Sequence, residues 1–113
     1  MGDRGQIFVK DVGVYLYTHW SGYELRQILK KSLERGKDRW DDPEYLSRII
    51  FDDMINGDKG ETGYGIGNTL HTDLDNPLIT VDCGNEMVIR DGESTSFEDY
   101  TKKIFKDDDE NEG

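Results

Sequence analysis

Between residues 6 and 57 the spacing of the apolar residues changes once, from the period of a strand to that of a helix. Residues 6–10 form a short apolar run, and residues 12–19 alternate strictly. One face of this second stretch carries aliphatic side chains: Val12, Val14 and Leu16. The other face carries aromatic rings with polar tips: Tyr15, Tyr17 and His19. We therefore predict two strands in a hairpin, the second of them central, because both of its faces suit packing.

Two helices are predicted to follow this hairpin. Ser21 and Glu24 have the spacing of a capping box, so a helix should cover about residues 22–35 and stop at Gly36. Asp42 before Pro43 is a second start signal, followed by an apolar stripe at helical spacing that ends at Gly57. The short link between the helices favours an antiparallel pair on one face of the sheet.

The second half of the chain predicts strands and a final helix. Residues 56–68 hold five glycines and indicate a loop that leads into a short strand. Residues 77–83 and 86–90 flank Gly84-Asn85, which suits a type II′ hairpin turn. Ser96 is placed to cap a helix whose apolar positions continue to Phe105. The predicted order is ββααβββα, a single layered α+β domain over residues 1–106 with helices packed on a mainly antiparallel sheet.

Composition narrows the functional classes. The net charge of −11 opposes direct nucleic-acid binding, which depends on neutralising phosphates. Five of the 25 acidic residues lie in residues 107–113, which we expect to be a disordered tail, and the body then carries about −6. Cys83 is the single cysteine, so an internal disulfide is impossible and a reducing compartment fits best. Without an apolar leader or a run of roughly 18 apolar residues, we expect a cytoplasmic protein with no membrane partner.

The first candidate site lies where the second strand gives way to the first helix. Its residues are aromatic or can bind a ligand through polar tips and free helix amides: Tyr15, Tyr17, His19, Trp20 and Ser21. The alternative is that the last helix covers these rings as ordinary core. The glycine-rich stretch adds Gly63, Tyr64 and Gly65 as a partner-contacting loop or a lid. It lacks the residue order of both phosphate-binding loops and lies between a helix and a strand, whereas those loops run from strand to helix.

Metal-binding and catalytic patterns are weak in this sequence. His19 and His71 could join Asp73 and Asp75 at a metal, but their spacing matches no metal-site pattern. Cys83 beside a histidine would need a third, orienting group that the sequence does not identify. We therefore expect no metal, no cofactor and no catalytic residue.

Three segments of the chain resemble a group of small uncharacterised proteins of bacteria and their phages. They are residues 14–22 (VYLYTHWSG), 39–46 (RWDDPEYL) and 61–66 (ETGYGI). The resemblance spans roughly residues 5–90 and carries no activity or catalytic residues. The resemblance implies only a bacterial or phage setting, in which accessory proteins of this size and acidity are often non-catalytic inhibitors or adaptors.

Three functional hypotheses are consistent with these patterns. The first is a small acidic, non-enzymatic binding or accessory protein that engages a basic protein partner through its negative surface. The second is a small-ligand-binding or enzymatic domain that uses the face formed by Tyr15, Tyr17 and His19, with a pocket beside His19. The third is a self-associating protein whose exposed aromatics, Trp20 or Trp40, form a dimer interface. We favour the first, because no nucleophile, metal site or phosphate site emerges from the sequence.

Overall fold

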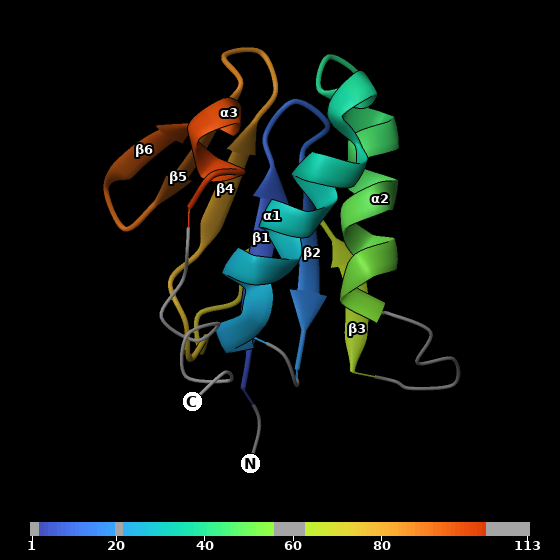
Figure 1. Ribbon diagram of the computed structural model, residues 1–113. Helices are drawn as coiled ribbons and strands as arrows, with labels where there is room; N and C mark the ends of the chain where they lie inside the picture. Colours follow the sequence, from blue (N-terminus) through green and yellow to red (C-terminus); the bar gives the residue numbers. More distant parts are fainter. Residues whose placement is uncertain (1–2, 20–21, 56–62, 104–113) are drawn as a thin grey trace.

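A six-stranded mixed sheet forms the centre of the molecule in the computed structural model, which describes residues 3–19, 22–55 and 63–103. The strand order is β3-β2-β1-β4-β5-β6 (Figure 1). The strands are β1 Gly5–Val9, β2 Val14–Thr18, β3 Tyr64–Gly67, β4 Ile79–Asp82, β5 Met87–Arg90 and β6 Glu93–Ser96. Neighbours pair antiparallel except β1 and β4, which are parallel. The predicted α+β class is confirmed.

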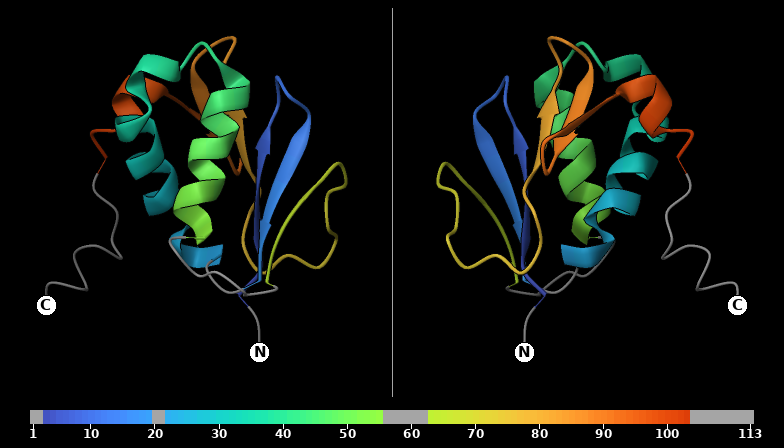
Figure 2. Two further views of the ribbon diagram at one scale, coloured as in Figure 1. Left: turned by 90° about the vertical axis from the view of Figure 1, so that its right-hand side faces the viewer. Right: turned by 90° about the vertical axis from the view of Figure 1, so that its left-hand side faces the viewer.

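Two antiparallel helices cover one face of this sheet, as Figures 1 and 2 show. They are α1 Leu25–Arg35 and α2 Pro43–Ile55, each preceded or followed by a short 3-10 turn, η1 Gly22–Glu24 and η2 Lys37–Arg39. The cap predicted for α2 is present, because the Asp42 carboxylate accepts a hydrogen bond from the Tyr45 amide at 3.4 Å. The short helix α3 Phe97–Tyr100 lies over the β5–β6 side.

The core lies between the helix pair and the sheet. From the helices it receives the stripe residues Leu25, Leu29, Leu33, Leu46, Ile50 and Met54, all nearly fully buried. From the sheet it receives alternate residues of the central strands: Ile7, Val9, Leu16, Ile79 and Val81. Because side chains alternate along a strand, the intervening residues of β1 and β2 face away from the helices. This second face carries the candidate site.

Several sequence-based predictions differ from the structure. β6 was missed, because Glu93–Ser96 contains no apolar residue and pairs as an edge strand. The type II′ turn at Gly84-Asn85 is wrong: four residues, 83–86, connect β4 to β5, and the positive φ is at Glu86. Two carboxylates stabilise that turn instead, since Asp11 accepts from the Cys83 amide at 2.6 Å and Asp82 accepts from the Asn85 amide at 3.2 Å.

The ends of two helices also differ from the predictions. Glu24 makes no capping hydrogen bond, and α1 begins only after the η1 turn; Ser21 lies outside the described residues. Ser96 does cap α3, since its hydroxyl accepts from the Asp99 amide at 3.1 Å, but α3 ends at Tyr100 rather than continuing toward Phe105. The predicted acidic tail, residues 107–113, lies outside the described residues. Of the helices described, none has the length and apolar character to cross a membrane.

Candidate functional site

An aromatic row lies on the face of the sheet opposite the helix pair. Phe8 of β1 and Tyr15 of β2 are direct cross-strand partners, and their rings stack with centroids 4.4 Å apart. Tyr17 follows on the same face of β2, and all three side chains are half-buried. The alternative that the last helix covers these rings is wrong. α3 instead packs Phe97 against Trp40 on the helix side of the sheet, with ring centroids 5.3 Å apart.

The segment between β3 and β4 covers one end of the aromatic row. In Figure 2 this yellow segment lies on the side of the sheet away from α1 and α2. Gln6, only 1% exposed, fixes it at two points: its side-chain amide donates to the Thr69 carbonyl at 3.1 Å, and its side-chain carbonyl accepts from the His71 amide at 3.0 Å. The His71 ring consequently stacks on Tyr17, with centroids 4.5 Å apart.

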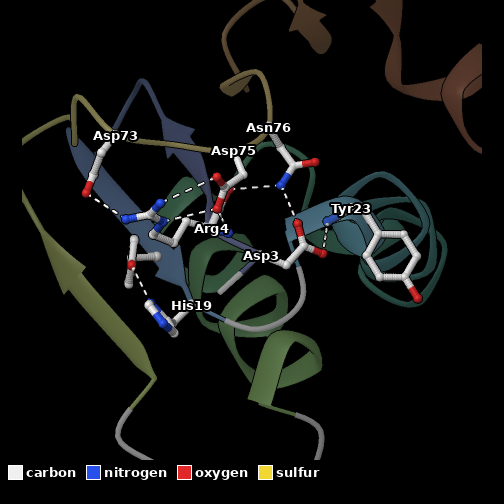
Figure 3. Close-up of polar contacts among 8 residues, drawn as sticks. Asp3, Arg4, His19, Tyr23, Asp73, Asp75 and Asn76 are labelled. Atoms are coloured by element: carbon white, nitrogen blue, oxygen red, sulfur yellow. Dashed lines mark hydrogen bonds and ion pairs between the residues drawn. The ribbon is translucent and has the colours of Figure 1, made fainter. Parts of the chain in front are cut away.

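Arg4 ties the far end of this segment to the N-terminal strand (Figure 3). Its guanidinium contacts Asp73 at 2.8 Å and Asp75 at 3.1 Å, and its backbone amide donates to the Asp75 carboxylate at 2.9 Å. These hydrogen bonds from Arg4 lower the pKa of Asp75, and the Asp75 hydrogen bond raises the pKa of Arg4. This cluster of Arg4, Asp73 and Asp75 contains two carboxylates and one guanidinium, so its net charge is negative.

Asp3 joins three parts of the chain next to Arg4 (Figure 3). Its amide donates to the His19 carbonyl at 2.7 Å, and its carboxylate accepts from the Tyr23 amide at 3.0 Å and from the Asn76 side chain at 2.8 Å. A carboxylate from outside the helix therefore satisfies an amide of the η1 turn, where the sequence predicted a local cap. The end of β2, the start of η1 and the segment before β4 are held together at this point.

A small hollow lies between the aromatic row, β3 and the covering segment. Its volume is about 190 Å³, and its lining includes Tyr15, Tyr17, Gly65, Gly67 and His71. A Cβ atom at Gly65 or Gly67 would meet nothing within 4 Å, so the absence of side chains at these glycines leaves the space open. Pockets for drug-sized ligands usually measure about 300–1,000 Å³. The hollow is therefore small for a ligand but sufficient for one side chain.

The structure brings together part of the predicted site. Tyr15, Tyr17 and Gly65 line the same hollow. His19 does not line it; the Tyr17 hydroxyl lies 3.1 Å from His19 Nδ1, at the end of the row. The hollow on this face therefore lies beside His71.

The remaining predicted residues have different positions. The Gly63 carbonyl accepts from the His19 amide at 2.7 Å, which extends the β2–β3 pairing, and Tyr64 opens β3 as a half-buried residue. Trp20 and Ser21 lie outside the described residues. Trp40, a candidate for a dimer interface, is partly buried, and its indole nitrogen donates to the Leu33 carbonyl at 2.9 Å.

The sequence-based predictions did not include Gln6 or Arg4, and they considered His71, Asp73 and Asp75 only as metal ligands or catalytic groups. One feature of the sequence could have indicated the role of Gln6. It is a polar residue at the start of an apolar run, and a polar side chain buried there needs hydrogen-bond partners. The ion pairs of Arg4 join residues about 70 positions apart along the chain, so no local pattern could predict them.

Two potential nucleophiles, Cys83 and Tyr17, have raised pKa values. Burial and the carboxylates of Asp11, Asp82 and Glu86 raise the pKa of the Cys83 thiol to about 12, and the residue is 6% exposed. Burial likewise raises the pKa of Tyr17, against the opposing effect of Arg4. Within the described ranges no three His, Cys, Asp or Glu side chains are arranged to hold a metal ion.

Comparison of the chain with protein-family models, with curated proteins and with solved structures found no significant match.

Proposed function

We propose that this protein is a small, acidic, non-enzymatic binding protein that engages a basic protein partner with the open face of its sheet. The observation that carries the proposal is the half-exposed aromatic row of Phe8, Tyr15 and Tyr17, which none of the described helices covers. Aromatic side chains are enriched in protein interfaces, because they bury a large area at a small cost in side-chain entropy.

The charge of the molecule supports a basic partner. A net charge of −11 on 113 residues produces a negative field that attracts basic surfaces and accelerates their association. The protonated state of the Cys83 thiol and the raised pKa of Tyr17 favour binding over nucleophilic chemistry. Long-range attraction from the net charge, followed by contact with the aromatic row, is the mechanism we infer.

Capture from a cell lysate with immobilised protein, at low and then high salt, tests this function. We expect basic proteins, identified by mass spectrometry, to be retained at low salt and released at high salt, because salt screens the attraction. Tyr15→Ala should then weaken binding of the captured protein by about 10-fold or more, since buried interface tyrosines often contribute over 1 kcal/mol.

Tyr45→Ala is the matched control for that variant. Tyr45 is 49% exposed and lies on α2, on the opposite side of the sheet, so its removal should leave binding unchanged. An equal loss of binding in Tyr15→Ala and Tyr45→Ala would contradict the proposal, and so would retention of the captured protein that does not change with salt concentration.

The small-ligand hypothesis remains a second candidate because a hollow lies on the predicted face, beside Tyr15 and Tyr17. Its size is its weakness, as it is below the usual range for ligand pockets. Binding of a small aromatic molecule that shifts the NMR signals of Tyr17 and His71 without affecting partner capture would favour it.

A further inference from the structure

Among the described residues, β3 is an edge strand that pairs only with β2, so its outer side presents a row of backbone groups without a strand partner there. The His19 amide donates to Gly63, so this pair is hydrogen-bonded, and the bonding alternates along an antiparallel ladder. Tyr17–Gly65 and Tyr15–Gly67 are therefore the next bonded pairs. The N–H and C=O groups of Tyr64 and Ile66 point away from β2, toward the open edge. Such an edge is a template for an added strand.

An apolar groove borders this edge on the helix side of the sheet. Its volume is about 280 Å³, and it lies between α2 and the β2–β3 edge. Its apolar lining comes from Val12, Val14, Leu16, Phe51 and Ile66, of which Ile66 is 62% exposed. Glu44 and Arg48 of α2 border it. A strand added to β3 would direct every second side chain into this groove.

The aromatic hollow borders the same edge on the other face of the sheet. Gly65 and Gly67 form part of its lining, and Tyr15 and Tyr17 are their direct partners in β2. The alternate side chains of an added strand would pass over these bare glycines onto the tyrosine rings. A lysine or arginine suits that position, because cations are attracted to aromatic faces and because the two carboxylates of Asp73 and Asp75 outweigh the single Arg4 guanidinium that they contact.

We propose that β3 binds an extended segment of a basic protein by strand addition. Apolar residues of that segment fill the groove beside α2, and the intervening lysines or arginines contact Tyr15 and Tyr17. This inference rests on the proposed function and specifies how the partner is recognised. A second copy of the chain fits less well, because its β3 would place only glycines over the tyrosines and two molecules of charge −11 repel each other.

A capped peptide of about eight alternating valines and lysines is the probe, measured against isotope-labelled protein by NMR and hydrogen exchange. We expect the amides of Tyr64 and Ile66 to become protected from exchange on binding. The Gly65 amide, already within the β2–β3 ladder, should change little. Two control peptides should each bind at least about 10-fold more weakly. An alternating valine–glutamate peptide loses the electrostatic attraction, and a peptide with its valines and lysines in separate blocks loses the alternation of apolar and basic side chains.

Two variants should block the site without unfolding the protein. Gly65→Val fills the aromatic hollow, and its Cβ meets nothing within 4 Å. Ile66→Asp places a charge at the mouth of the apolar groove. Each should weaken binding of the valine–lysine peptide by about 10-fold or more. The control is Leu70→Asp. The Leu70 side chain is 44% exposed and lines neither the aromatic hollow nor the apolar groove, so this variant should not change binding of the valine–lysine peptide.

The outcomes separate this inference from the proposed function. Suppose partner capture stays salt-sensitive and dependent on Tyr15, but hydrogen exchange at the Tyr64 and Ile66 amides does not change on binding and neither blocking variant weakens binding. Strand addition is then wrong and the proposed function stands. If the two amides are protected before peptide is added, or sedimentation finds a dimer, the chain itself or a second copy occupies the edge, and the inference fails. If neither the valine–lysine peptide nor any basic protein binds, both fail.

Discussion

Buried carboxylates control local structure at single residues. Asp82 is 5% exposed and accepts hydrogen bonds from the Asn85 side chain and backbone at 2.9 and 3.2 Å, with Lys10 at 3.5 Å. The Asn85 hydrogen bond is the largest of the effects that lower the pKa of Asp82. This carboxylate therefore stabilises the β4–β5 turn in place of the glycine conformation that the sequence suggested.

Asp82 should make stability depend on acid pH. Its folded pKa is lowered from an ordinary 3.8, so its contribution is present above about pH 4 and is lost as pH falls through the folded pKa. We expect Asp82→Asn to lower the free energy of unfolding by about 1 kcal/mol at pH 7. In urea titrations below pH 4 the difference from the wild type should shrink. A constant difference at every pH would show that the carboxylate charge is not the cause.

Gly22 is required by close packing at the junction of β2 and η1. A Cβ there would lie 2.6 Å from the Asp3 carbonyl oxygen and 2.9 Å from the Arg4 carbonyl carbon. Because these are backbone atoms, Gly22→Ala should lower the free energy of unfolding by about 2–3 kcal/mol. Gly65→Ala is the control, and should change it by less than about 0.5 kcal/mol because no atom lies near its Cβ. Thermal unfolding of both variants measures the contrast.

At the scale of elements, long-range polar contacts position the covering segment. Residues 68–78 contain no regular structure, yet Gln6, Arg4 and Asp3 hold them against the first strand and the start of the helical region. Local sequence explains the apolar stripes of the helix pair and the Asp42 cap of α2. The candidate site depends instead on contacts between distant residues.

Gln6→Met should loosen the covering segment while preserving the volume of the side chain. The Thr69 carbonyl and the His71 amide would both lose their partner, so we expect a loss of about 1–2 kcal/mol in the free energy of unfolding. Faster hydrogen exchange at the His71 amide should accompany it. Leu70→Ala, in the same segment, should change neither quantity. Unchanged exchange in Gln6→Met would mean that the segment is held without Gln6.

At the scale of the whole molecule, charge opposes folding and supports recognition. A net charge of −11 causes self-repulsion, which salt screens. We expect the free energy of unfolding to rise by about 0.5–1 kcal/mol between about 0.01 M and about 0.5 M sodium chloride. Deleting residues 107–113 removes five acidic residues and should reduce that rise. If the truncated protein responds to salt as strongly as the full chain, the tail contributes nothing to the repulsion.

Contiguous patterns in the sequence were sufficient to predict the β1–β2 hairpin, the two packed helices, the α+β class and the aromatic face of β2, because periodicity and capping act over a few residues. Strand order, the β1–β4 parallel pairing and β6 arose only in the tertiary structure, since pairing across the chain has no local signature. The same holds for the site. The sequence placed Tyr15, Tyr17 and His19 on one face, but distant contacts of Gln6 and Arg4 decided that the His71 ring, and not α3, stacks on Tyr17.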